Sequence, residues 1–539
     1  MKQFLFLLAF FFLLVFSAFS SVYYVATNGS DTNNGKIGSA FATITKSQTV
    51  VTAGDTVYIR GGTYLMAESQ IAKYNSIWAY VTYLDKSGLP GKRINYWAYP
   101  GEIPVFDLKN VKPANYRVTV FQVNGSYIHI KGLEVIGTQV TILTHTQSEC
   151  FENQGSNNIY EMLKMHDGQA IGFYLTKGSN NLILNCDAWN NADYTSENKN
   201  GGNVDGFGGH SSKGSTGNVF RGCRAWFNSD DGYDCISSSE SIVFENCWAF
   251  YNGYSTAFKS LGDGNGFKAG GHGAAPGSIS NMPNPVPSHT VRFCLSYRNK
   301  ASGFYANHHI ITGNNWYNNT AYRNGTNYNM LSQNIVKDAT SGNDITVDVP
   351  GINHVLHNNI SFRYGSQTEL SNMGTSLNTF NSFSPNSGVS VSSEDFMSID
   401  ESLLILPRKA DGSLLDIDFL KLKPTSDLID KGKNLGFAFS GTAPDFGAFE
   451  YKSVSAINNP VNDAVNIYPT LVDDVLNIEV LSVSNDDTFQ VIGLDGKILR
   501  NQKLTNLVSN LDMSDFDSGL YMVRLVLGNE IVVRKVIKK

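Results

Sequence analysis

The sequence has few charged residues and no excess of basic ones. Only 16% of its 539 residues are charged, and the formal net charge is -6. Because phosphate binding needs a basic surface, this balance argues against nucleic acid as a main partner. An anionic polymer could still be held through a bound cation. The sequence does contain 50 glycines and 26 tyrosines, which indicate a β-rich, turn-rich extracellular protein.

Long apolar runs are missing after the first twenty residues. In residues 1–20, Lys2 precedes an apolar run from Phe4 to Phe16, and a small-x-small pattern, Ala18-Phe19-Ser20, follows. We therefore expect a secretory signal peptide. The alternative, an anchoring transmembrane helix, would need a longer run and a basic stop-transfer flank. The mature chain is expected to be soluble or attached to a surface by other means.

A local pattern recurs along the chain at irregular intervals. Six reference positions share an apolar residue three before, a small residue two after and an aromatic residue three after: Cys186, Cys223, Cys247, Cys294, Asn319 and Asn359. By subtraction of these numbers, the intervals are 37, 24, 47, 25 and 40 residues. Constant local pattern with variable insertions is typical of a solenoid whose coils stack on one another. The sequence thus predicts an all-β fold, a parallel β-helix.

The repeat also predicts what several side chains do. Six cysteines in a secreted chain usually suggest disulfides, but four of them share one repeat column, so we interpret them as a buried ladder. Asparagines recur five positions after the reference: Asn191, Asn228, Asn252, Asn299 and Asn324. Arginines recur four after it, at Arg298, Arg323 and Arg363. We expect these arginines to stack on a solvated face, although such a column could also bind a polyanion.

Four aspartates and one lysine lie in three successive repeats. Asp205 is in the 37-residue interval, Lys268 is in the 47-residue interval, and Asp230, Asp231 and Asp234 follow the strand between them. If the insertions leave at equivalent corners, all five converge on one side of coils about 4.8 Å apart. Clustered carboxylates suit calcium, which takes six to eight oxygen ligands. The ordinary alternatives are an Asp-rich turn and a solvated surface lysine.

The residues around this cluster resemble the family 9 polysaccharide lyases. The similarity is carried by Gly217 to Trp226, Asn228 to Asp234 and Gly262 to Lys268, and extends in general plan over residues 22–451. It implies a right-handed parallel β-helix that cleaves pectic polymers by β-elimination. It also implies that Asp205, Asp230, Asp231 and Asp234 hold calcium and that Lys268 is the Brønsted base. Cys235 departs from the aliphatic residue expected after the last aspartate, and we expect it to pack without disturbing the site.

The chemistry of elimination fits these residue types. Removing the C5 proton of a uronic acid requires its carboxylate to be neutralised, which a bridging cation can do as a Lewis acid. A lysine can act as the base only when it is neutral. We expect calcium and burial to lower the pKa of Lys268. Activity should therefore rise with pH and disappear with a chelator.

Other functions remain open from the sequence. We expect a calcium-dependent pectate lyase acting on polygalacturonate, an acidic plant cell-wall polysaccharide, with a rhamnogalacturonan backbone as the alternative substrate. Gly271-His272-Gly273, with His210 nearby, is similar to a polygalacturonase motif. Those hydrolases use paired carboxylates and carry Asn-Thr-Asp and Arg-Ile-Lys motifs that this sequence lacks. A non-catalytic polysaccharide-binding adhesin is the alternative from another class.

The chain is expected to contain two folded domains. We place the β-helix at residues 21–452, a linker at 453–463 and a small β-sandwich at 464–539, where short alternating strands recur. The last segment resembles the C-terminal sorting domain of type IX secretion, which implies recognition by outer-membrane secretion machinery and a secreted or cell-surface location. A carbohydrate-binding module is the alternative for this domain. We expect a monomer.

Overall fold

The computed structural model describes residues 20–144, 147–196, 199, 201–272, 282–452, 465–480, 482–484, 486–494, 496–528 and 530–539. The expected signal peptide, apart from its last residue, and the expected linker at 453–463 lie outside the described residues. Among the helices of the described part, none is long and apolar enough to cross a membrane.

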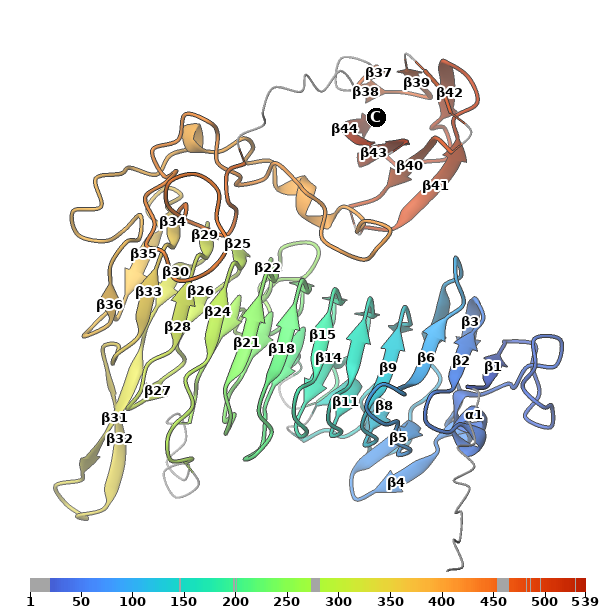
Figure 1. Ribbon diagram of the computed structural model, residues 1–539, viewed down its shortest axis with the longest axis horizontal. Helices are drawn as coiled ribbons and strands as arrows, with labels where there is room; N and C mark the ends of the chain where they lie inside the picture. Colours follow the sequence, from blue (N-terminus) through green and yellow to red (C-terminus); the bar gives the residue numbers. More distant parts are fainter. Residues whose placement is uncertain are drawn as a thin grey trace, which may run out of the picture.

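Three long sheets of mostly parallel strands run side by side along one axis (Figure 1). The first sheet consists of β1 (Val22–Val25), β2 (Thr56–Ile59), β6 (Ile94–Ala98), β9 (Ile128–Lys131), β12 (Ile159–Glu161), β15 (Leu182–Leu184), β18 (Asn218–Arg221), β21 (Ile242–Glu245), β24 (Thr290–Arg292), β28 (Asn315–Tyr317), β33 (Val355–His357) and β36 (Leu377–Asn378). The second consists of β3 (Gly62–Leu65), β7 (Pro104–Asp107), β10 (Glu134–Ile136), β13 (Lys164–His166), β16 (Asp187–Trp189), β19 (Arg224–Trp226), β22 (Trp248–Phe250), β25 (Leu295–Tyr297), β29 (Thr320–Tyr322) and β34 (Ile360–Phe362).

The third sheet carries the candidate site. Its strands are β4 (Lys73–Asn75), β5 (Trp78–Leu84), β8 (Arg117–Val123), β11 (Ser148–Asn153), β14 (Ala170–Leu175), β17 (Phe207–Gly209), β20 (Tyr233–Asp234), β23 (Phe267–Lys268), β26 (Ser302–Tyr305), β30 (Thr326–Asn329) and β35 (Thr368–Ser371). From β2 to β35, successive coils contribute strands to the three sheets in turn. This arrangement confirms the predicted right-handed parallel β-helix.

Aromatic side chains of the third sheet stack inside the coil. Phe207 lies 5.1 Å from Tyr233, and Tyr233 lies 4.6 Å from Phe267, as ring centroids in stacked geometry. A glycine stands before each of these residues. A Cβ atom at Gly232 would lie 2.7 Å from the carbonyl oxygen of Gly266, so the coils can approach this closely only without a side chain there. The packed rings hold neighbouring strands in one register.

Polar ladders fix the same register at the turns. The predicted asparagine column is present, and Nδ2 of Asn228 donates to Oδ1 of Asn252, which repeats between Asn252 and Asn299. Each amide also donates to a buried carbonyl of an earlier coil. All six cysteines are buried and free, and the four in the repeat column lie within the core. Thus the predicted asparagine and cysteine columns lie in the interior of the helix.

The N-terminal end of the coil is closed by α1 (Ile44–Val50), visible in Figure 1. The side chain of Thr43 accepts a hydrogen bond from the backbone N–H of Lys46, which satisfies one free donor of the first turn. Ile44 then packs into the core. A short 3-10 turn, η1 (Glu68–Gln70), follows nearby. Covering this end removes an exposed sheet edge.

The outer face of the second sheet is covered by the chain that follows β36. Its 3-10 turns η3 (Ser393–Asp395) and η4 (Glu401–Ile405) lie in a segment whose apolar residues pack on Trp189 and Trp226. Arg298 and Arg323 were expected on a solvated face, but both are only about 29% and 28% exposed because they pair with Glu401 of η4. Arg363 is exposed.

A small hairpin projects beside the third sheet. It is formed by β31 (Ser332–Lys337) and β32 (Asp344–Val349), and the short β27 (His309–Ile310) pairs with β31. The side chains of His308, Gln333 and Asp348 meet at its base, where the aspartate carboxylate accepts from both.

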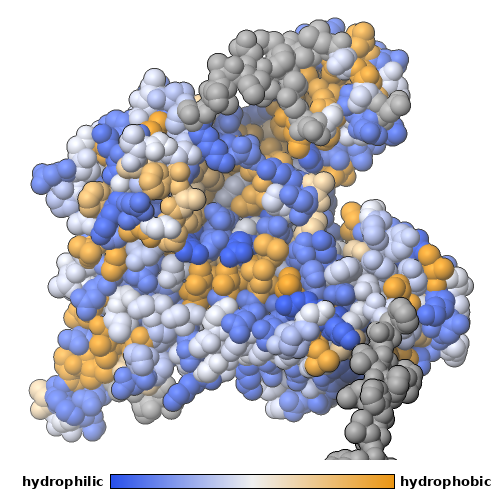
Figure 2. Space-filling model, in the orientation of Figure 1, coloured by the Kyte–Doolittle hydropathy of each residue, from blue (hydrophilic) through white to orange (hydrophobic). Residues whose placement is uncertain are grey.

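The C-terminal domain is a small β-sandwich, as predicted. One sheet contains β37 (Val465–Tyr468), β39 (Val475–Val480) and β42 (Val508–Asp512), and the other contains β38 (Leu471–Val472), β40 (Thr488–Ile492), β41 (Ile498–Lys503), β43 (Gly519–Leu527) and β44 (Glu530–Lys538). Both sheets share one hydrophobic core. Figure 2 shows the domain overhanging a partly hydrophobic face of the β-helix. A cleft of about 620 Å³ lies between them, lined by residues that include Trp189 and Lys497.

Candidate active site

The three strands that carry the predicted site are neighbours in the third sheet. β17 pairs with β20, and β20 pairs with β23. Asp205 lies just before β17, Asp230 and Asp231 lie in the turn before β20, Asp234 ends β20, and Lys268 ends β23. All five side chains are buried. The structure therefore brings together the five residues that the sequence singled out.

Three of the aspartates form a compact group with the lysine. Oxygen atoms of Asp205, Asp231 and Asp234 all lie within 4.8 Å of one another. The Nζ atom of Lys268 lies 3.0 Å from Oδ2 of Asp231 and 3.2 Å from Oδ2 of Asp234. The group is thus an acidic cluster with a single cation at its edge.

Backbone and amide donors hold each carboxylate in place through one oxygen. Oδ1 of Asp205 accepts from the backbone N–H of Asp231 at 3.0 Å. Oδ1 of Asp231 accepts from the backbone and side-chain N–H groups of Asn265 at 2.6 and 2.8 Å. Oδ1 of Asp234 accepts from the backbone N–H of Ile236 at 2.7 Å. The Oδ2 atoms of Asp231 and Asp234 remain directed at the lysine.

Asp230 differs from its neighbours. Its Oδ1 accepts from the backbone N–H of Asp263 and its Oδ2 from that of Asn203, both at 2.8 Å. The carboxylate therefore ties together the loops that enter the three strands. Each oxygen keeps a second lone pair, so this side chain can still serve as a ligand while it orients the turn.

Burial and mutual repulsion disfavour the charged form of these aspartates. Burial raises the pKa of Asp231 to about 7 against the opposing effect of Lys268. The pKa of Asp205 is raised well above its usual value by burial and by the Asp230 carboxylate. Burial also raises the pKa of Asp230. A cluster of this kind is stabilised by added positive charge.

The pKa of Lys268 moves against the expected direction under the influence of the protein's own groups. Burial alone lowers it, as expected, but the carboxylates of Asp231 and Asp234 outweigh burial and raise it well above its usual value. The carboxylates of Asp230 and Asp205 also raise the pKa of Lys268, so four carboxylates oppose the effect of burial. Positive charge that offsets those carboxylates would lower the pKa of Lys268 and favour its neutral form.

The residues present fit a calcium ion. Calcium binds oxygen at 2.3–2.6 Å, so two ligands of one ion are at most about 5 Å apart. The aspartate oxygens meet this limit. Moreover, Oδ2 of Asp231 is buried and accepts no hydrogen bond, although it lies near the lysine amine. An all-oxygen donor set with a buried, incompletely satisfied carboxylate is chemically suited to a hard cation.

Two features of the site were missed from the sequence. Asn265 orients Asp231 through two hydrogen bonds. It lies in the glycine-rich stretch before Lys268, where an amide among glycines is the only signal. The second feature is a repeat of glycine, aromatic residue and one further residue, which ends in Tyr174, Gly208, Asp234, Lys268 and Tyr305 on five successive strands. Aligning the glycines would have placed these five side by side.

The two histidines noted near the site are held by other contacts. His272 is buried, and its Nε2 bonds to the carbonyl oxygen of Ser238. The ring of His210 lies 4.8 Å from that of Tyr174. Burial lowers the pKa of both histidines. Neither histidine belongs to the acidic cluster.

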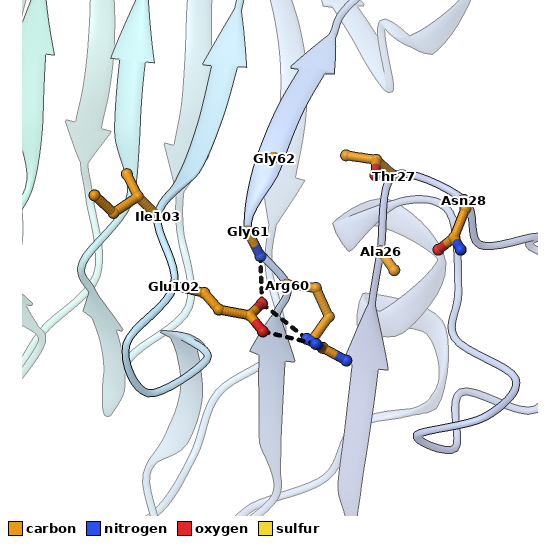
Figure 3. A pocket seen from close by; sticks show the side chains of 8 residues that line it. All are labelled: Ala26, Thr27, Asn28, Arg60, Gly61, Gly62, Glu102 and Ile103. Carbon is orange, nitrogen blue, oxygen red and sulfur yellow. Dashed lines mark hydrogen bonds and ion pairs between the residues drawn. The ribbon is translucent and has the colours of Figure 1, made fainter.

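A hollow near the N-terminal end offers no comparable chemistry. It has a volume of about 540 Å³ and is lined by residues that include Arg60 and Glu102 (Figure 3). The guanidinium donates to both carboxylate oxygens of Glu102, and the backbone N–H of Gly61 donates to one of them. The charges of this hollow are therefore already paired with each other.

Two family models match the sequence. Residues 23–382 match the Pel9A-like right-handed β-helix region, and residues 459–539 match the secretion system C-terminal sorting domain. The first match contains the whole acidic cluster and Lys268.

Individual proteins are similar over most of their length. Pectate lyase L of Dickeya chrysanthemi is 34% identical over 436 residues, which cover 80% of this chain and 90% of that protein. A solved structure described as a rhamnogalacturonan lyase is 45% identical, covers 75% of this chain and 97% of the other, and has a TM-score of 0.71. The crystal structure of pectate lyase Pel9A is 31% identical, covers 80% and 97% of the two chains, and has a TM-score of 0.63.

Proposed function

The chain belongs to the Pel9A-like family of right-handed β-helix proteins, and we propose that it is a secreted, calcium-dependent lyase. In this proposal it cleaves a pectic backbone by β-elimination. Its relatives are named as lyases of pectic polysaccharides, so it is a polysaccharide lyase. The observation that carries the proposal is the contact of Lys268 with the carboxylates of Asp231 and Asp234 on adjacent strands.

Asp205, Asp231 and Asp234 are the proposed calcium ligands, with Asp230 as a fourth that also fixes the turn. Bound calcium would neutralise a galacturonate carboxylate and so make the neighbouring C5 proton more acidic. Backbone N–H donors hold the Oδ1 atoms of all three, and oxygen atoms of the three carboxylates lie within 4.8 Å of one another. A preorganised site of this kind needs no rearrangement when the substrate arrives.

Lys268 is the proposed base. Its neutral Nζ takes the C5 proton, the electron pair forms the C4–C5 double bond, and the C4–O bond breaks. The leaving glycosidic oxygen takes a proton from water, and Lys268 then returns its proton to solvent, which leaves one new chain end and one unsaturated uronate. Because the protein's carboxylates raise the pKa of Lys268, the neutral fraction and the rate should both grow with pH.

The side chains beside the site favour a substrate of moderate charge. Ten residues, one from each of ten adjacent strands, share one register on the outward face of the third sheet and are called the outward row: Tyr83, Gln122, Glu152, Tyr174, Gly208, Asp234, Lys268, Tyr305, Asn329 and Ser371. Lys268 is the only cation among these ten, and Glu152 adds a negative charge. A fully charged polyacid would gain little electrostatic attraction along this row.

We therefore favour a rhamnogalacturonan backbone, in which only alternate sugars carry a carboxylate, as the substrate. The 45% identity to the structure described as a rhamnogalacturonan lyase supports this choice. Polygalacturonate is the second candidate, because the curated relatives are named pectate lyases. The polygalacturonase-like hydrolase and the non-catalytic adhesin have no comparable support.

The C-terminal domain assigns the protein to export. Its sequence matches the secretion system sorting domain, so the protein is secreted or displayed at the cell surface. We propose that outer-membrane secretion machinery recognises this domain. The proposed substrate, an extracellular polymer, is consistent with that location.

Ultraviolet absorbance of the unsaturated uronate tests the proposal. Purified protein is assayed with calcium at alkaline pH on rhamnogalacturonan and on polygalacturonate. Lys268→Ala should lower the rate by about 10² to 10⁴-fold, the usual contribution of a general base. Exposed Lys213→Ala is the matched control. Chelator should abolish the signal. New reducing ends without absorbance would instead show hydrolysis, and no new ends on either polymer would favour the adhesin.

A further inference from the structure

Two tyrosines lie on either side of Asp234 and Lys268 within the outward row. Lys268 pairs in register with Tyr305 on β26, one strand downstream. On the other side, Asp234 pairs with Gly208, and Gly208 pairs with Tyr174 on β14. Because adjacent strands are about 4.8 Å apart, Tyr305 is next to the base while Tyr174 begins two strands from Asp234.

The glycine between Tyr174 and Asp234 makes the arrangement nearly symmetrical. A Cβ atom at Gly208 would lie 2.6 Å from Cδ2 of Tyr174 and 3.1 Å from a ring carbon of His210. The tyrosine ring therefore occupies the space above Gly208, leaning towards Asp234. His210 supports the ring from the side at a centroid distance of 4.8 Å. One aromatic surface thus lies about one strand to each side of the Asp234–Lys268 pair.

Both tyrosines are available to a ligand and carry no charge. Each is partly exposed, whereas the aromatic residue that precedes it points into the core and is fully buried. Burial raises the pKa of Tyr305 to about 12, and burial likewise raises that of Tyr174. Neither hydroxyl is hydrogen-bonded to another of the described residues. They can therefore present an apolar ring and a neutral donor, but not a base.

Resting on the proposed function, we infer that Tyr174 and Tyr305 are the platforms for the two uncharged sugars that flank the reacting galacturonate. In an alternating backbone, every galacturonate has a 6-deoxyhexose on both sides. The methyl group and C–H faces of such a sugar pack well on an aromatic ring, while the hydroxyl donates to sugar oxygens. In polygalacturonate the same positions would hold carboxylates. The two tyrosines therefore select the alternating polymer.

The contrast with the rest of the row supports this assignment. Beyond Tyr174 come Glu152, Gln122 and then Tyr83, whose hydroxyl already accepts a hydrogen bond from Asn124, and beyond Tyr305 come Asn329 and Ser371. The four polar residues among these offer no aromatic stacking surface, and Gln122 and Glu152 are buried. Two of the three tyrosines of the row therefore lie beside the reacting pair, where discrimination between neutral and charged neighbours affects the rate most.

The test compares two polymers and two substitutions at each tyrosine. Tyr174→Ala, Tyr305→Ala and the corresponding Phe variants are assayed on a rhamnogalacturonan backbone stripped of side chains and on polygalacturonate. Tyr74→Ala, a half-exposed residue on β4 outside the row, is the control. We expect each Ala variant to lower the ratio of kcat/KM for the alternating polymer to that for polygalacturonate by about tenfold, mainly through KM, and each Phe variant to restore most of it.

Three results separate the possible failures. Equal losses on both polymers, or no loss, would overturn the platform assignment and leave the elimination mechanism intact. Wild-type elimination of polygalacturonate alone would also overturn it. If the wild type cleaves neither polymer, the proposed function fails. Calorimetric titration of Lys268→Ala protein with a galacturonate–rhamnose oligosaccharide then tests the role of the tyrosines separately. Adding Tyr174→Ala or Tyr305→Ala to that protein must weaken binding of the oligosaccharide for the inference to stand.

Discussion

Two buried clusters of charge, on the second and third sheets, have opposite balances. On the second sheet, Asp187 pairs with Arg224 at 2.8 Å and with Arg408 at 2.7 Å. All three side chains are at most 10% exposed. Burial alone would raise the pKa of Asp187, but the two guanidinium groups hold it well below its usual range. On the third sheet, four carboxylates face one lysine, and three of them have raised pKa values.

The difference separates a structural site from a functional one. Arg408 lies 221 residues from Asp187, so its contact fastens the covering segment to the coil, and no further ligand is needed. The acidic cluster costs stability unless positive charge is added, and natural proteins retain such arrangements mainly where they bind or react. Charge balance, rather than burial, therefore identifies the site.

Breaking the cluster of Asp187, Arg224 and Arg408 should have the largest effect on folding. Asp187→Asn leaves two buried guanidinium groups without a carboxylate, and we expect a loss of about 3–5 kcal/mol in the free energy of unfolding. Urea unfolding followed by circular dichroism measures it. The control is Asp344→Asn, which breaks an exposed ion pair with Lys337 and should cost less than about 1 kcal/mol. A loss below 1 kcal/mol for Asp187→Asn would contradict the structural assignment.

Neutralising one member of the acidic cluster should affect calcium rather than folding. In the wild type, calcium at a hundred times its dissociation constant should add about 2.7 kcal/mol of stability. Asp231→Asn should remove most of this gain and lower lyase activity about a hundredfold. In chelator, the variant and the wild type should be equally stable. Thermal unfolding with calcium and with chelator measures both. A full calcium response in the variant would contradict the ligand assignment.

The stabilisation that Asp187 gives the cluster on the second sheet should also be lost in acid, within a defined pH range. The folded pKa of Asp187 is depressed, so its stabilisation is present above the unfolded value of about 3.9 and is lost as pH falls towards the folded value. The difference in unfolding free energy between wild type and Asp187→Asn should thus be constant from pH 7 to about 5 and shrink below about 4. A difference that grows with acid would contradict the sign.

The sequence predicted the coil and the location of the cluster because both depend on short-range repetition. The reference column of Cys223 and Cys247 sets the register, and insertions of known position bring Asp205 and Lys268 to adjacent strands. Contacts made by segments outside the repeat could not be predicted from it. Arg408 reaches Asp187 from a segment without the repeat, and the direction of the Lys268 pKa depends on distances within the folded cluster.

The smallest predicted effect concerns the charge of the outward row. Glu152 is next to Tyr174 in the row, and its Oε1 accepts from Thr176 and Gln154. Glu152→Gln keeps the shape of this buried side chain but removes a negative charge beside Tyr174. We expect KM for polygalacturonate to fall about two- to threefold at low salt. The change should be smaller on rhamnogalacturonan, because only alternate sugars of that polymer carry a carboxylate, and it should also be smaller at high salt, because salt screens the charge. Measuring KM for both polymers at two ionic strengths tests this, and an unchanged KM for polygalacturonate at low salt would mean that the polymer does not pass over Glu152.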